Sequence, residues 1–76
     1  LIVVQQDKPG VVAHITRCLS EKNVNIAYMK LYREEKGSTA YSIVESDDLL
    51  PDEAIQRIRE NRYVRDVMLI QTQKEA

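Results

Sequence analysis

The chain of 76 residues contains no tryptophan or phenylalanine, and it has only one cysteine and one histidine. A single cysteine cannot form a disulfide within the chain, which fits a reducing compartment such as the cytoplasm. One His and one Cys cannot complete a closed zinc site, which needs four ligands. Cys18 alone also cannot hold an iron–sulfur cluster. We therefore expect no metal site and no cofactor within this domain.

The sequence also lacks an excess of either charge and any long apolar segment. Eleven basic side chains balance twelve acidic ones, for a formal net charge of −1. This mixture gives no electrostatic reason to bind nucleic acid or an anionic membrane. No apolar run approaches the roughly 20 residues that span a bilayer, and no signal peptide is visible. With Leu1 as its first residue, the chain is expected to be a cytoplasmic domain cut from a longer protein, spanning 1–73 with a polar tail at 74–76.

Hydrophobic patterns and turn residues predict six elements in the order βαββαβ. Leu1–Val4 is apolar on both faces, which is typical of a central strand covered on both sides. The other segments are a helix from Val11 to Lys22, strands at Val24–Arg33 and Ser38–Glu45 around a turn at Glu34–Gly37, a helix from Pro51 to Asn61, and a strand within Tyr63–Thr72, around Val67–Ile70. We expect an α+β fold of the ferredoxin-like type, with two helices on one face of a four-stranded antiparallel sheet.

The second predicted strand leaves the orientation of its faces open, because both of its side-chain rows are substantially apolar. Either a bulge shifts the register, or the outer face of the sheet is also covered. The two apolar faces of the first strand favour the covered outer face. One row holds Val24, Ile26, Tyr28 and Tyr32, and the other holds Ala27, Met29 and Leu31.

The turn Asp7–Gly10 joins the first strand to the first helix and combines residues that suit a small zwitterion. Backbone N–H groups at a helix start attract a carboxylate. Gly10 has no side chain to block a close approach, and the carboxylate of Asp7 can meet an ammonium. Simpler roles stay open: Asp7 can cap the helix, Gly10 can serve packing, and Asn25 can bond local backbone.

Asp7-Lys8-Pro9-Gly10-Val11 after an apolar strand, followed by Val24-Asn25-Ile26 at the next strand, resembles the ACT domain family from Leu1 to about Gln71. These domains are small regulatory modules that bind amino acids in metabolic enzymes. The resemblance implies ligand contacts from Gln5, Asp7, Gly10, Val11 and Asn25. The backbone amides of Gly10 and Val11 would bind the carboxylate of the amino acid. Asp7 and the side-chain carbonyl of Asn25 would bind its ammonium. Gln5 would contact a small polar side chain of the ligand. Gln5 stands where serine-binding relatives often have His, and Gln cannot carry charge.

Three segments look more specifically like the ACT domain of the bacterial iron–sulfur-dependent L-serine dehydratase beta subunit: 25–29, 33–37 and 40–45. This implies a parent lyase that converts L-serine to pyruvate and ammonia with a 4Fe–4S cluster, while the domain itself has no catalytic residue. It implies L-serine as the first candidate ligand, allosteric regulation, a homodimer through ACT domains, and contact with the dehydratase alpha and beta subunits. The alternatives are a structural dimerisation module without ligand, or the ACT domain of another amino-acid enzyme such as phosphoglycerate dehydrogenase.

Tyrosines on the predicted sheet and a His–Cys pair raise two further ideas. The RNA-recognition fold has the same element order, but its first strand carries an aromatic residue and this one does not. Tyr28, Tyr32 and Tyr41 are therefore expected to pack against a partner. His14 and Cys18 lie four residues apart on the first helix, and Cys18 is expected to be a small buried apolar residue.

Overall fold

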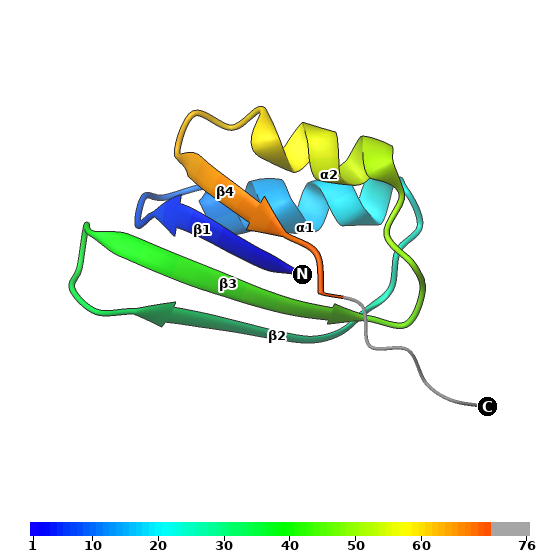
Figure 1. Ribbon diagram of the computed structural model, residues 1–76, viewed down its shortest axis with the longest axis horizontal. Coiled ribbons are helices and arrows are strands. Elements are labelled where there is room, and N and C mark those ends of the chain that lie inside the picture. The colour runs from blue at the N-terminus through cyan, green and yellow to red at the C-terminus, as the bar shows by residue number, and fades with distance from the viewer. Residues whose placement is uncertain (71–76) are drawn as a thin grey trace.

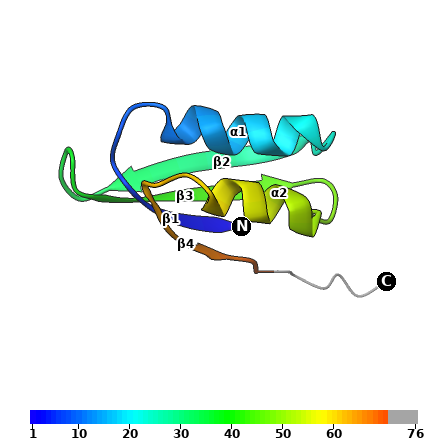
Figure 2. The ribbon, with the colours of Figure 1, turned by 90° about the horizontal axis from the view of Figure 1, so that it is seen from above.

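The computed structural model describes residues 1–70, which form four strands and two helices in the predicted order. The strands pair antiparallel in the order β2-β3-β1-β4, and both helices cover one face of the sheet (Figures 1 and 2). The ferredoxin-like fold is thus confirmed, whereas the expected tail at 74–76 and the domain end at 73 lie outside the described residues. The elements are β1 (Ile2–Gln6), α1 (Val11–Glu21), β2 (Ile26–Arg33), β3 (Thr39–Ser46), α2 (Asp52–Arg59) and β4 (Val64–Met68).

The core lies between the sheet and the two helices. Strand β1 is central, as predicted, and its residues alternate between the two faces. Val3 points to the helices and is fully buried, whereas Ile2 and Val4 on the outer face are half-buried. Within residues 1–70 both helices lie on the same face, so the outer face is open and the expected second cover is absent from this part of the chain. The buried cluster comprises Leu1, Val3, Val11, Ile15, Cys18, Leu19, Val24, Val44, Ala54, Ile55, Ile58 and Val67.

The ambiguity in β2 is explained by a bulge. The register against β3 shifts between Ile26 and Tyr28, so that Ile26 and Met29 both pack against the core although their positions differ in parity. Beyond the bulge, Tyr28 and Tyr32 lie on the open outer face, each about half exposed. Tyr32 pairs in register with Tyr41, and their ring centroids are 6.3 Å apart.

Helix α1 begins and ends at two residues with left-handed backbone. Its N-cap is Gly10, at φ 89°, and no side chain caps this end. Asp7 is therefore not a helix cap. At the other end Asn23 has φ 58°. Its N–H donates to Ser20 O at 2.9 Å, and Val24 N–H donates to Leu19 O at 3.0 Å. These two bonds form a Schellman motif, which ends the helix just before Asn23.

Helix α2 begins after Pro51, with Asp52 and Glu53 in its first turn, as the sequence indicates. It ends at Arg59, two residues before the predicted Asn61. Strand β4 covers Val64–Met68 and therefore lies earlier than the expected centre around Val67–Ile70. No helix among residues 1–70 has the length and apolar character needed to cross a membrane.

Candidate functional site

An open pocket of about 460 Å³ lies where the β1–α1 turn meets the end of β2 and the β2–β3 hairpin. Both segments lie at the same end of the sheet (Figure 1). The pocket is lined by Asp7, Lys8, Pro9, Gly10, Val12, Leu31, Arg33, Lys36 and Gly37. Two of the five predicted ligand residues, Asp7 and Gly10, thus line this open surface hollow, and Gln5, Val11 and Asn25 do not.

The carboxylate of Asp7 joins the β1–α1 turn to the hairpin. Its Oδ2 accepts hydrogen bonds from Gly37 N–H at 3.0 Å and from Arg33 Nη1 at 2.8 Å. The Asp7 N–H donates to Ser38 O at 2.7 Å. The bond from Gly37 N–H and the charge of Arg33 lower the pKa of Asp7 below its usual value. Asp7 is therefore a stable negative charge at the edge of the pocket.

Gly10 is required by its backbone and not by close packing. A Cβ at this position would meet no atom within 4 Å, yet φ is +89°, a conformation that L residues rarely adopt. The space beside Gly10 is therefore open toward the pocket. Val11, in contrast, has a fully buried side chain, and its N–H makes only a long contact of 3.5 Å with Lys8 O. The Val11 side chain therefore faces the core, and Val11 does not line the pocket.

Gln5 belongs to the inner face of the sheet, is 2% exposed and does not line the pocket. Its Oε1 accepts a hydrogen bond from Ser42 Oγ at 2.7 Å. The predicted contact of this side chain with a ligand would thus require it to leave Ser42. The sequence reasoning missed Ser42, although its place between Ala40 and Val44 in the alternating inner row of β3 marks it as a buried polar residue.

Asn25 lies at the other end of the sheet, just before β2. Its Nδ2 donates to Asp47 Oδ2, and its backbone carbonyl accepts from Asp47 N–H at 3.1 Å. Strand β2 has eight residues, so it separates Asn25 from the Asp7–Arg33 ion pair by roughly 25 Å. Within one chain, Asn25 and the Asp7–Gly10 turn therefore do not form a single pocket.

Three charged residues near these positions were missed by the sequence reasoning. Arg33 and Lys36 border the pocket, and Asp47 holds Asn25. In the sequence they are an ordinary strand end, a hairpin residue and an acidic loop residue. Only the pairing of β2 with β3, and of β3 with β1, brings them to these places.

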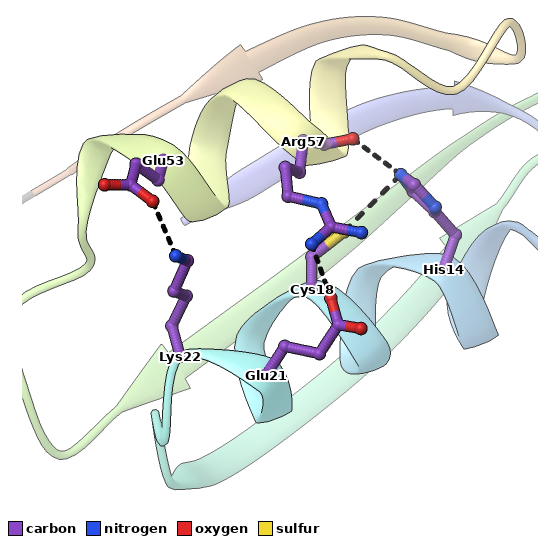
Figure 3. Close-up of polar contacts among 6 residues, drawn as sticks. All are labelled: His14, Cys18, Glu21, Lys22, Glu53 and Arg57. Carbon is purple, nitrogen blue, oxygen red and sulfur yellow. Dashed lines mark hydrogen bonds and ion pairs between the residues drawn. The ribbon is translucent and has the colours of Figure 1, made fainter.

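His14 and Cys18 lie between the two helices (Figure 3). Neither residue lines the pocket. His14 Nε2 is 2.8 Å from Arg57 O and 3.6 Å from Cys18 Sγ. A carbonyl only accepts, so Nε2 carries the hydrogen and cannot take a proton from the thiol. Burial also raises the pKa of the Cys18 thiol, the opposite of what a nucleophilic cysteine needs. Cys18 is the small buried residue that the sequence indicates.

The surroundings of this pair are structural contacts between α1 and α2. Glu21 and Arg57 form an ion pair at 2.8 Å, and Lys22 pairs with Glu53 (Figure 3). Across residues 1–70, His, Cys, Asp and Glu side chains form no group of three that could hold a metal ion.

Comparisons with known proteins identify the family of this chain, and that family agrees with the observed fold. The model of the ACT domain family matches residues 1–62. Over 69 residues the chain is 30% identical to D-3-phosphoglycerate dehydrogenase of Methanocaldococcus jannaschii, covering 91% of this chain and 13% of that protein. Over 71 residues it is 32% identical to the Bacillus subtilis enzyme of the same name, covering 92% of this chain and 14% of that protein. The chain spans about one-seventh of the length of these curated relatives.

Both relatives carry the name of the enzyme given above as an alternative parent. The closer resemblance to L-serine dehydratase, with the lyase activity and iron–sulfur cluster that it implied, gains no support from them.

Proposed function

The chain belongs to the ACT domain family, and we propose that it is the amino-acid-sensing regulatory domain of an enzyme of the D-3-phosphoglycerate dehydrogenase type. The reaction of such an enzyme would belong to the rest of a longer protein, because this chain covers 13–14% of the relatives. The observation that carries the proposal is the Asp7 carboxylate beside the open start of α1, in a pocket closed on one side by the hairpin.

This pocket offers complementary groups to the two charges of a free amino acid. The start of α1, with Gly10 as N-cap, supports binding of the carboxylate through backbone N–H groups and the helix dipole. Asp7 Oδ2 is occupied by Arg33 and Gly37, while its Oδ1 makes no hydrogen bond within residues 1–70 and can accept from an ammonium. L-serine, with its small polar side chain, is the first candidate ligand. Millimolar binding requires only about −4 kcal/mol, which a few charge-assisted bonds supply.

The open edge of β2 supports a homodimer. At the other edge of the sheet, Val67 N–H donates to Asp66 Oδ1 at 2.8 Å, and Val67 O accepts from Arg59 Nη2 at 3.1 Å. These side-chain bonds block β4 from pairing with another strand. The backbone of β2 receives no such bond within residues 1–70, and β2 has eight residues against five in β4. A second copy is therefore expected to pair along β2.

Antiparallel pairing of two β2 strands about a two-fold axis is the arrangement that we propose. It sets the hairpin end of one copy, with Arg33, Glu34, Glu35 and Lys36, against the Asn25 end of the other, with Asp47 and Asp48. The two basic side chains of the hairpin end can then face the acidic pair. The same pairing would bring Asn25 of a second copy alongside Arg33 and hence close to Asp7. Two equivalent sites would result, each combining residues that one chain keeps apart.

Sedimentation equilibrium and calorimetric titration with L-serine test this function. We expect a dimer that binds serine at millimolar or lower concentration. Asp7→Ala should abolish the binding heat, while Glu60→Ala, at an exposed acidic residue after α2, should retain it. Absence of heat with serine and with other small amino acids, while the dimer stays intact, would contradict a sensor.

That result would favour the second candidate, a structural module without ligand. The open outer face of the sheet supports this alternative, because Tyr28 and Tyr32 on β2, Ile43 on β3 and Met68 on β4 are exposed there. The half-buried Ile2 of β1 lies between Ile43 and Met68. In such a module Asp7→Ala would leave subunit association unchanged. Neither the wild type nor the variant would give binding heat with an amino acid.

A further inference from the structure

We propose that Asp47 is a positioning residue of the amino-acid site: it turns the Asn25 amide so that Oδ1 is presented to the ammonium of the ligand. This inference rests on the proposed function, because it concerns the half-site that a second copy would supply. The proposal gives a role to Asp47, which the sequence alone indicates only as a solvent-exposed loop residue.

The direction of the hydrogen bond carries the argument. A carboxylate only accepts, so the contact between Asp47 Oδ2 and Asn25 must use the NH₂ group of the amide. The amide is planar, and fixing Nδ2 on Asp47 leaves Oδ1 pointing to the opposite side. Without such a partner, the amide could turn either a donor or an acceptor to the ligand. Asp47 thus converts an ambivalent side chain into an acceptor.

The backbone holds this pair in place. Asp47 N–H donates to Asn25 O at 3.1 Å, next to the first rung of the β2–β3 ladder, where Ile26 pairs with Ser46. Asp47 therefore meets Asn25 through both its backbone and its side chain. Asn25 itself is exposed, so its free oxygen can reach a group outside the chain.

Electrostatics favour the same ligand group. The hydrogen bond from Nδ2 to the Asp47 carboxylate polarises the Asn25 amide and makes its Oδ1 a stronger acceptor. Such an oxygen binds an ammonium more strongly than it binds an uncharged donor. Asp47 also adds a negative charge beside the amide, whereas the pocket side of the composite site carries Arg33 and Lys36. The ammonium is thus drawn to the Asn25–Asp47 side and to Asp7, and the carboxylate to the helix start.

A pair of ligands that differ only at the ammonium tests the proposal. L-glycerate has a hydroxyl where L-serine has the ammonium, and both can be titrated into the 76-residue chain by calorimetry. We expect the wild-type chain to prefer serine, and Asp47→Ala to lower this preference about tenfold, the size of one charge-assisted hydrogen bond. Asp48→Ala, the matched control on the same loop, should keep it. An unchanged preference in Asp47→Ala, or equal weakening of both ligands, would overturn the role.

Two further measurements separate positioning from a general structural effect. In an Asn25→Ala background, Asp47→Ala should weaken serine binding much less than it does in the wild type, because Asp47 acts mainly through Asn25 and only its charge remains to be lost. Fully additive losses would overturn this. The side-chain NH₂ resonances of Asn25 should shift in Asp47→Ala and not in Asp48→Ala, with or without ligand. Unshifted resonances would refute the orientation itself, whereas shifted resonances in a chain that binds no amino acid would refute the proposed function.

Discussion

Arg33 and Asp7 form an ion pair of 2.8 Å between the last residue of β2 and the first residue after β1. The Asp7 side chain is only 16% exposed, and its Oδ2 also accepts from Gly37 N–H in the hairpin. The β1–α1 turn and the β2–β3 hairpin are therefore joined before any ligand arrives. In the proposed function, a ligand ammonium would share a carboxylate that already holds one wall of the pocket in place.

Because these bonds lower the pKa of Asp7, its contribution to stability depends on pH in a defined direction. A depressed folded-state pKa stabilises the fold above the unfolded pKa, near 3.9, and this stabilisation is lost as pH falls through the folded value. We expect Asp7→Asn to unfold at lower urea concentration than the wild type at pH 7. The two midpoints should converge below about pH 4. Urea unfolding of both chains across this range measures the difference.

Asp48→Asn is the control for this pH dependence, since Asp48 is exposed and its carboxylate accepts no hydrogen bond within residues 1–70. Its midpoint should follow that of the wild type across the titration. Identical midpoints of Asp7→Asn and wild type at pH 7 would show that the ion pair adds nothing to the fold.

Self-association through β2 is testable with one apolar residue beside that edge. Leu31 is 44% exposed and lines the pocket together with Val12. Placing a lysine there would bury its charge in the proposed interface. We expect Leu31→Lys to raise the dimer dissociation constant tenfold or more, because burial of a leucine is worth about 1.5–3 kcal/mol. Sedimentation equilibrium over a concentration series gives this constant.

Met68→Lys provides a matched control, because Met68 is 42% exposed and lies on β4 at the opposite edge. It should leave the dimer intact. Dissociation by Met68→Lys, with Leu31→Lys still dimeric, would place the interface elsewhere than β2.

The element order could be predicted from the sequence because its signals are local. Alternating apolar residues, the Asp-Lys-Pro-Gly turn and the Asn23 stop each act within a few residues. The bulge in β2, in contrast, depends on tertiary packing, because it lets both Ile26 and Met29 reach the core. The sequence therefore left the bulge as one of two alternatives. The end of α2 at Arg59 and the early start of β4 depend on packing in the same way.

The site was only half predictable, for a topological reason. In a βαβ unit, the helix returns the chain to the end of the sheet where the first strand began. Asp7 follows β1 and Asn25 precedes β2, so they lie at opposite ends although both adjoin α1. Patterns within the sequence place each residue beside an element, but only the topology shows that one chain keeps the two residues apart.

The end of α1 offers a prediction that is independent of ligand and partner. Asn23 adopts φ 58°, and its N–H and that of Val24 close the Schellman motif on Ser20 and Leu19. An alanine in this left-handed conformation costs about 1 kcal/mol because its Cβ crowds the backbone, whereas glycine has no such cost. We expect Asn23→Ala to lower the free energy of unfolding by about 1 kcal/mol, and Asn23→Gly to keep or raise it. Urea unfolding measures both, with exposed Ser20→Ala expected to stay within about 0.5 kcal/mol of wild type. Equal stability of the alanine and glycine variants would mean that the left-handed backbone at Asn23 does not terminate the helix in solution.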